Sequence, residues 1–168
     1  MQNVEYKAEL REPELVRGQL VAIGAKRLQE VEQEDTYFVL PDGRLKRRVS
    51  TEQPPEWIFY HRADRIGPRL SNYTILSDDA ARQRWGTVNL KPWLTVRKSR
   101  EVWMLENIRI HLDTVENIGR FLEIEAVVSD EHPTAACRQR VAELRDEMQP
   151  WLGEAIAVSY ADLAASIR

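Results

Sequence analysis

The chain has 168 residues, of which 43% are hydrophobic and 30% are charged, and its formal net charge at pH 7 is -3. This is the composition of a soluble globular protein, and the length suits a single domain over residues 1–168. The negative net charge excludes an overall basic field that would attract nucleic acid or an anionic membrane. One cysteine, Cys137, excludes an intrachain disulfide and a thiolate zinc cluster.

The same features predict the cellular location and the partners of the protein. No apolar stretch resembles a signal peptide or approaches the roughly 20 residues that cross a bilayer, so we expect a cytoplasmic protein. We expect neither a nucleic-acid partner nor a membrane partner, and either a monomer or a homodimer. Cys137 lies in a segment typical of a helix, and we interpret it as a structural thiol.

Strand patterns dominate the chain. Apolar and polar residues alternate over 2–11, which predicts a strand, and Pro13 and Gly24 bracket a helical pattern. Strands at 25–40 and 44–50 flank a Pro-Asp-Gly turn. The later expected elements are strands at about 57–64, 70–76, 93–100, 101–106, 107–115 and 118–128, and helices at 78–85, 133–148 and 160–167. Hairpins and few helices favour an antiparallel sheet or barrel with peripheral helices.

Charged residues occupy every second position in many of these strands. Strand side chains alternate between two faces, so the members of each pair point the same way. Apolar residues lie between the charges around Glu123 and Glu125, which makes one face apolar and the other ionic. The ionic positions hold the bases Lys7, Lys46, Arg48, Arg62, Lys98, Arg100 and Arg109 and the acids Glu5, Asp113, Glu123 and Glu125.

If these side chains share an interior, the bases outnumber the acids and protein pairs cannot neutralise the set. A buried ion without a partner costs several kcal/mol, so a highly charged anion such as a polyphosphate would complete the balance. Arg and Lys suit phosphate oxygens. Clustered carboxylates resist ionising together unless a divalent cation binds, and hard Mg²⁺ or Mn²⁺ prefers carboxylate oxygen. The pattern therefore predicts a metal–polyphosphate site.

A plainer interpretation is a sheet with one solvated face and no site, because each charge pair alone is typical of such a face. On the same grounds we expect His111 to be a hydrogen-bonded strand residue rather than a ligand. Trp57, Phe59 and Tyr60 are expected to pack rather than to stack on a base.

The ordered series of motifs resembles a known family over nearly the whole chain. The motifs are Asn3-Val-Glu5-Tyr-Lys7, Gln33-Glu-Asp35-Thr-Tyr37-Phe38, Gly43-Arg-Leu-Lys46-Arg-Arg48, Tyr60-His-Arg62, Ser71-Asn-Tyr73, Val96-Arg-Lys98-Ser-Arg100, Arg109-Ile-His111-Leu-Asp113, Gly119-Arg-Phe121-Leu-Glu123-Ile-Glu125 and Tyr160-Ala-Asp162-Leu163. In this order they resemble the CYTH superfamily, also called the triphosphate tunnel metalloenzymes.

The resemblance implies a mainly β (α+β) fold, an eight-stranded antiparallel barrel that forms a tunnel with helices outside. It implies a divalent-metal-dependent enzyme that binds a nucleoside, thiamine or inorganic triphosphate (ATP, thiamine triphosphate or tripolyphosphate), and we expect hydrolysis. Two alternatives remain open, a class IV adenylate cyclase that makes cyclic AMP and pyrophosphate, and a non-catalytic nucleotide- or polyphosphate-binding module.

The resemblance also implies roles for residues. Glu5, Glu123 and Glu125 would hold Mg²⁺ or Mn²⁺, and these three with Lys7 would be catalytic. The phosphates would be held by Lys7, Lys46, Arg48, Arg62, Lys98, Arg100 and Arg109. Asn3 departs from the family motif, which usually has a Glu there, and this weakens the case for a second metal site.

Overall fold

A computed structural model describes residues 1–51, 53–86 and 89–167. Its strands are β1 (Gln2–Leu10), β2 (Lys26–Val39), β3 (Arg44–Ser50), β4 (Gln53–Arg62), β5 (Arg69–Leu76), β6 (Lys91–Leu105), β7 (Ile108–Val115), β8 (Gly119–Val127) and β9 (Leu152–Ala155). Its helices are α1 (Pro13–Ala22), α2 (Asp78–Trp85), α3 (Thr134–Met148) and α4 (Tyr160–Ser166), with a 3₁₀ turn, η2 (Gln149–Trp151), after α3.

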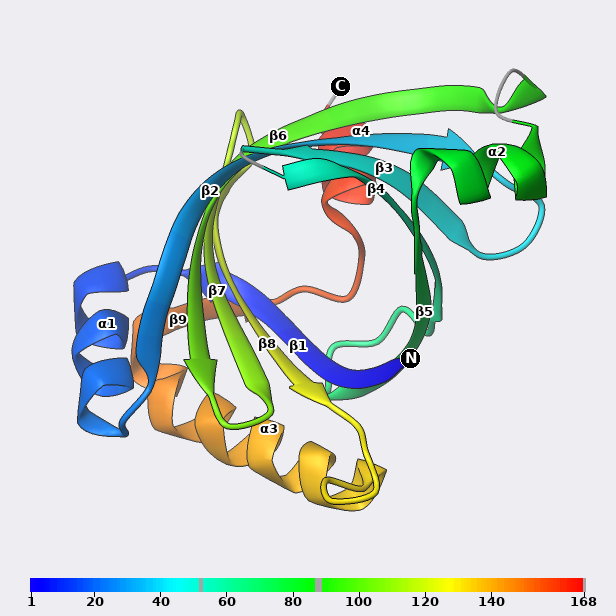
Figure 1. Ribbon diagram of the computed structural model, residues 1–168. Coiled ribbons are helices and arrows are strands. Elements are labelled where there is room, and N and C mark those ends of the chain that lie inside the picture. Colours follow the sequence, from blue (N-terminus) through cyan, green and yellow to red (C-terminus); the bar gives the residue numbers. More distant parts are fainter. Residues whose placement is uncertain (52, 87–88, 168) are drawn as a thin grey trace.

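Eight strands close into an antiparallel barrel in the order β5-β4-β3-β2-β6-β7-β8-β1, which confirms the expected fold class (Figure 1). The seam is a short pairing of β1 with β5, in which Gln2 lies opposite Asn72 and Glu5 lies opposite Arg69. The far end of β1 pairs instead with the short strand β9, at Ala8 and Leu10. Closure removes unpaired edges along the barrel and encloses the inward-facing side chains.

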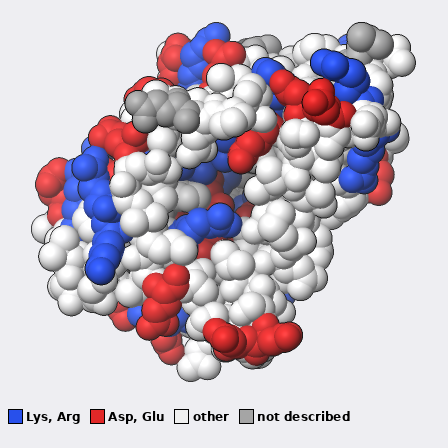
Figure 2. Space-filling model, viewed as in Figure 1, with Lys and Arg blue, Asp and Glu red and all other residues white. Residues whose placement is uncertain are grey.

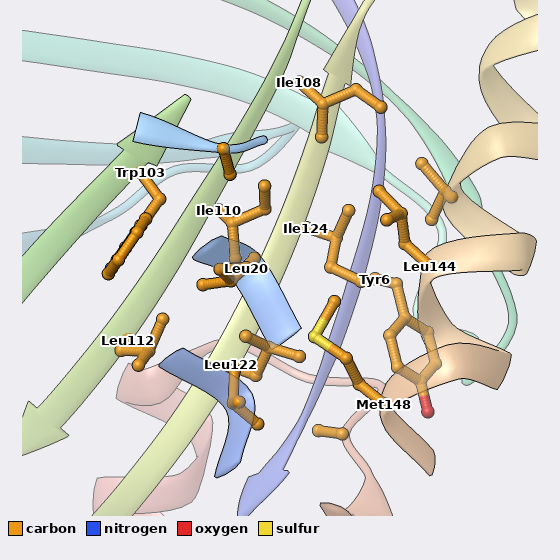
Figure 3. Packing of buried hydrophobic residues seen from close by; sticks show 14 of the residues in the cluster. Tyr6, Leu20, Trp103, Ile108, Ile110, Leu112, Leu122, Ile124, Leu144 and Met148 are labelled. Atoms are coloured by element: carbon orange, nitrogen blue, oxygen red, sulfur yellow. The ribbon is translucent and has the colours of Figure 1, made fainter. Parts of the chain in front are cut away.

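The main hydrophobic core lies outside the barrel wall, beneath α1 and α3. Outward residues of β1, β7 and β8 pack there against both helices, and Figure 3 shows Ile110 and Ile124 beside Leu144 and Met148. Because outward positions of these strands are apolar, their alternate, charged positions point into the barrel. The helices thus cover the apolar face and leave the ionic face inside, as the alternation predicts.

Two smaller clusters fix the remaining helices. Ala81 of α2 packs against Leu45 and Trp57, on the outside of β3 and β4. Tyr160 and Ala161 of α4 pack into a cluster with Tyr37, Val96 and Phe121, and α4 lies behind the strands in Figure 1. Within the described residues, no helix has both the length and the apolar character that a bilayer crossing requires.

The structure corrects two expected element boundaries and adds one strand that was not expected. The strands expected at 93–100 and 101–106 are one strand, β6, because Arg100 and Glu101 point to opposite faces and need no turn between them. Strand β4 begins at Gln53 rather than near Trp57, and its register shift against β3 accommodates the prolines that predicted a break. Strand β9 was not expected, since four residues carry almost no periodic signal.

Candidate functional site

The barrel encloses a cavity of about 310 Å³ that opens on one face of the molecule. Figure 2 shows a hollow near the centre of this face, with Lys or Arg and Asp or Glu side chains visible inside it. All predicted site residues except Lys98 line the cavity, namely Glu5, Lys7, Lys46, Arg48, Arg62, Arg100, Arg109, Glu123 and Glu125. Among the described residues, the lining holds six cationic side chains and four carboxylates, the fourth being Glu56, so cations exceed acids there by two.

Three of these four carboxylates, Glu5, Glu123 and Glu125, lie on the wall formed by β1, β8 and β7. Glu5 lies opposite Glu125 and Lys7 opposite Glu123 across β1 and β8, and His111 lies opposite Glu123 on β7. Oxygen atoms of Glu123 and Glu125 and a ring nitrogen of His111 all lie within 4.8 Å of one another. This wall therefore offers two carboxylates and one imidazole to a single ion.

His111 lies on strand β7 as expected, and its ring is also a member of this group of possible ligands. Its Nδ1 lies 3.6 Å from Glu123 Oε2 and 3.9 Å from Glu125 Oε1, and it has no hydrogen-bond partner among the described residues. His111 belongs to the same alternating pattern that identified the glutamates. The sequence does not show, however, whether the imidazole ring contacts carboxylates or instead contacts a hydroxyl or carbonyl group.

Glu123 lies at the centre of the wall. Lys7 Nζ is 3.8 Å from its Oε1 and Arg100 Nη2 is 3.5 Å from the same atom. Burial raises the pKa of this carboxyl, but the opposing effect of Arg100, the His111 ring and Lys7 is larger and holds the pKa well below its usual range. Glu123 is therefore ionised at neutral pH.

Glu5 is held apart from the other two glutamates by arginines. Arg62 Nη1 donates to Glu5 Oε1 at 2.6 Å, and Arg69 Nε lies 3.6 Å from the same oxygen. Arg62 Nε and Nη2 are buried without a hydrogen-bond partner among the described residues, and so is Arg109 Nε on the opposite wall. Both arginines line the cavity, so these guanidinium groups keep donors available to an anion.

Asp35 holds the two inward cations of β3, Lys46 and Arg48, which we call the cationic wall. Asp35 was absent from the predicted site residues. It is 1% exposed, and Arg48 donates to both of its oxygens at 2.8 Å. Lys98 Nζ donates to Asp35 at 3.0 Å, and Lys46 Nζ lies 3.3 Å away. Burial raises the pKa of Asp35, but the three cations outweigh it and hold the pKa well below its usual range.

This arrangement explains the place of Lys98, which does not line the cavity. Its side chain is 1% exposed and lies behind the wall, on Asp35. Burial lowers the pKa of Lys98 well below its usual value despite that carboxylate. A sequence signal for Asp35 exists, because Gln33, Asp35 and Tyr37 alternate in phase, and Asp35 lies opposite Arg48 across β2 and β3.

The inner end of the cavity is bounded by the start of α4. Tyr160 Oη donates to Asp113 Oδ2 at 2.7 Å, and Asp113 accepts two hydrogen bonds from Arg100 at 2.8 and 2.7 Å. Lys7 Nζ donates to the carbonyl of Val158 at 3.2 Å and lies 4.1 Å from the centre of the Tyr160 ring. Burial lowers the pKa of Lys7 to about 8, which leaves most of this amine protonated at pH 7.

Asn3 lines the outer part of the same cavity. It is 4% exposed, and its Oδ1 is buried without a partner among the described residues. It lies opposite Ser71 on β5 and Val127 on β8. This position therefore contributes a neutral oxygen to the wall that carries the glutamates.

Comparisons with known proteins agree with this architecture. A Methanocaldococcus jannaschii protein described as a candidate adenylate cyclase is 28% identical over 139 residues, which cover 77% of this chain and 79% of that protein. The solved PH1012 protein of Pyrococcus horikoshii OT3 has a TM-score of 0.75 at 21% identity, over 96% of this chain and 98% of that one. A Hippeastrum candidate adenylyl cyclase, described as having a dominant triphosphatase activity, has a TM-score of 0.64 at 15% identity, over 99% and 96% of the two chains.

At these identities the two solved structures support the fold alone. The CYTH domain profile matches residues 1–152, which is most of the chain and all eight barrel strands. The barrel, its inward charges and this match lead to one conclusion: the chain belongs to the CYTH domain family.

Proposed function

We propose that this protein is a divalent-metal-dependent enzyme that binds a triphosphate inside its barrel and hydrolyses it. The observation that carries the proposal is the lining of the cavity, where six cations face four carboxylates and guanidinium nitrogens remain without partners among the described residues. A polyphosphate would neutralise the excess and occupy those donors. Membership of the CYTH family supports the proposal.

The phosphates would lie among the cationic side chains that line the cavity. Arg48 and Lys46, oriented by Asp35, would hold one end, and Arg100 and Lys7 would hold the part nearest α4. Arg62 and Arg109 would contact the chain of phosphates from opposite sides through their unpartnered nitrogens. Lys98 would act through Asp35 rather than by touching the phosphates.

The acidic wall fits a divalent cation. Glu123 and Glu125 with His111 provide two carboxylates and a nitrogen within one ion's reach, a set that suits Mn²⁺ or Mg²⁺. Glu5 would join them only by exchanging its bond to Arg62, and Asn3 adds a neutral oxygen. When bound, the ion would neutralise phosphate oxygens and orient the nucleophile.

In hydrolysis, water attacks the terminal phosphorus, the bond to the bridging oxygen breaks, and orthophosphate leaves. Preorganised cations stabilise the charge that develops on the phosphate oxygens, and Lys7 and Arg100, which line the cavity beside Glu123, would supply such cations. Cyclisation is the second candidate, favoured by the description of the Methanocaldococcus relative. There, the ribose 3′-hydroxyl of ATP attacks the α-phosphorus and pyrophosphate leaves.

A product analysis tests the proposal. The protein is incubated with Mg²⁺ or Mn²⁺ and ATP, thiamine triphosphate or tripolyphosphate, and the products are separated. We expect orthophosphate, and a loss of at least about 100-fold in rate for Glu123→Gln, because a catalytic-site charge is removed. Glu143→Gln, an exposed change on α3, is the matched control and should leave the rate unchanged.

Each other outcome has a defined meaning. Cyclic AMP with pyrophosphate would assign the cyclase reaction. Binding of all three ligands without turnover would assign the non-catalytic module, for which the neutral Asn3 is the structural argument. Absence of both binding and turnover would exclude a triphosphate site.

A further inference from the structure

The seam between β1 and β5 contains a buried arginine that does not line the cavity. Arg69, the first residue of β5, is 2% exposed and lies opposite Glu5 across the seam. Its Nη1 donates to the carbonyls of Arg65, Ile156 and Ala157, which holds the guanidinium group in place. Its Nε and Nη2 are buried and have no hydrogen-bond partner in the described part of the chain. Buried donors without a partner are rare in proteins, because each one costs free energy.

Glu5 lies close to Arg69 but bonds to Arg62 instead. Glu5 Oε1 accepts from Arg62 Nη1 at 2.6 Å, whereas Arg69 Nε is 3.6 Å from the same oxygen, which is beyond hydrogen-bond distance. Glu5 also lies opposite Glu125 across β1 and β8, and repulsion between two carboxylates on one face opposes a move in that direction. The carboxylate therefore has two arginines within reach, of which only Arg62 lines the cavity.

A phosphate chain would compete with Glu5 for Arg62. Arg62 Nε and Nη2 are also without partners within the residues that the structure describes, so this side chain has donors for an anion. A phosphate oxygen bonded to Arg62 carries the same sign of charge as Glu5 and repels it. A shift of about 1 Å toward Arg69 would bring Glu5 Oε1 within hydrogen-bond distance of Arg69 Nε and relieve this repulsion.

We propose that Arg69 is a positioning residue, which receives the Glu5 carboxylate when a polyphosphate replaces it on Arg62. This inference rests on the proposed function and adds to it a residue outside the cavity. In the empty protein Glu5 is the counter-charge of Arg62, and in the complex it bonds Arg69. Arg62 thus has an anionic partner in both states, and Glu5 has a cationic one, so phosphate binding strands no buried charge.

A double-mutant cycle on tripolyphosphate binding tests this exchange. Dissociation constants are measured by calorimetry in EDTA for the wild type, Arg69→Met, Glu5→Gln and the variant that combines both changes. We expect Arg69→Met to weaken binding by about tenfold more in the wild-type background than in the Glu5→Gln background, as expected for one charge-assisted hydrogen bond that forms on binding. The direct attraction between Arg69 and phosphate is present in both backgrounds and cancels in this ratio.

Arg65→Met is the matched control, because Arg65 is the neighbouring arginine and is exposed. It should change tripolyphosphate affinity by less than about twofold in either background, since an exposed charge is screened by solvent and salt.

A second measurement requires no change at Arg69 and so does not depend on whether Arg69→Met folds. The proton NMR signal of Arg69 Nε–H should shift downfield when tripolyphosphate is added to the wild type, because this proton becomes hydrogen-bonded. The shift should be much smaller in Glu5→Gln, whose side chain has no charge for phosphate to repel.

Equal effects of Arg69→Met in the two backgrounds, or a larger effect in the Glu5→Gln background, would overturn the exchange and leave phosphate binding intact. An Arg69 Nε–H signal that does not respond to bound tripolyphosphate would overturn it as well. Wild-type protein that binds no tripolyphosphate would overturn the proposed function and this inference with it.

Discussion

At the scale of single residues, Asp35 determines the geometry of the cationic wall. One carboxylate, 1% exposed, accepts from Arg48 and Lys98 and lies 3.3 Å from Lys46. Three cations would repel one another in a dry interior, and one central anion makes their proximity tolerable. The cavity therefore presents positive charge that is already oriented before any ligand arrives.

Substituting Asp35 tests this role. We expect Asp35→Asn to lower the free energy of unfolding by about 3–5 kcal/mol, because it leaves buried cations without their counter-charge. Asp130→Asn, on an exposed loop, should stay within about 0.5 kcal/mol of wild type. Urea denaturation of the two variants measures both quantities, and equal, small losses would contradict the assigned role.

The pH dependence of stability gives an independent test of the same residue. The folded pKa of Asp35 lies well below its unfolded value of 3.8, so ionised Asp35 stabilises the fold at pH values above 3.8. That contribution is lost as the pH falls from about 4 through the folded pKa, because the unfolded state then binds more protons. The unfolding free energy of Asp35→Asn should therefore decline less steeply between about pH 5 and 3 than that of wild type.

The sequence predicted inward cations better than it predicted what holds them. Lys46 and Arg48 were recognised because their alternation can be read within one strand, without knowing which strands lie beside it. Asp35 was seen only in a motif, and Arg69 was missed, because a lone acid or base at the phase of a strand acquires meaning only from the strand beside it. Lys98 has the same phase as Arg100 yet lies behind the wall, a difference in depth that alternation does not encode.

At the scale of elements, Arg69 is one of the residues that attach the segment leading into α4 to the barrel, together with Lys7. Arg69, at the start of β5 and 2% exposed, donates to the carbonyls of Arg65, Ile156 and Ala157 at 2.7, 3.2 and 2.6 Å. The connection between β9 and α4 is thereby placed against the inner end of the cavity. Tyr160 then follows and bonds Asp113.

Loss of this arginine should loosen that connection selectively. We expect Arg69→Met, which keeps much of the side-chain volume, to speed amide hydrogen exchange over residues 156–166 and to leave exchange in β7 and β8 unchanged. The neighbouring exposed Arg65→Met should alter neither region. Uniform acceleration across the barrel would instead show that Arg69 supports the whole fold.

Element boundaries show where local patterns fail. The sequence pattern did not reveal that β6 continues through the adjacent charges Arg100 and Glu101, which the strand separates onto its two faces. Arg100 meets Asp113 inside, and Glu101 meets Arg17 and Trp103 outside. The helix ends at Pro13 and near Gly24 were predictable because proline and glycine act locally, whereas strand continuity depends on the partners β2 and β7.

At the scale of the whole molecule, the described residues of the interior carry more positive charge than the described acids balance. An excess of buried positive charge favours the binding of an anion but lowers the stability of the fold, as is common at functional sites. Lys46 illustrates it, because Asp35 already has two closer cations and burial lowers the pKa of Lys46. The fold does not need this third positive charge, but a polyphosphate would use it.

We therefore expect Lys46→Met to leave the free energy of unfolding within about 1 kcal/mol of wild type, or to raise it, because a partly unpaired buried ion is replaced by an apolar side chain. Tripolyphosphate affinity in EDTA should fall by about tenfold, as expected for the loss of one charge-assisted contact. The exposed Lys26→Met should change neither property. A marked loss of stability with unchanged affinity would reverse this assignment.

The seam between β1 and β5 has a consequence for the order in which the chain folds. Strand β1 carries Glu5 and Lys7, yet its partners β5, β8 and β9 are encoded far downstream, with Lys7 opposite Glu123 and Ala8 opposite Ala155. Local hairpins such as β2–β3 close only a short loop. Strand β1, in contrast, pairs with segments far downstream, so its pairing closes long loops and has a larger entropic cost. During synthesis β1 therefore leaves the ribosome before all of its partners and is among the last strands of the barrel to be paired. Folding kinetics, rather than final stability alone, should be sensitive to changes in its residues.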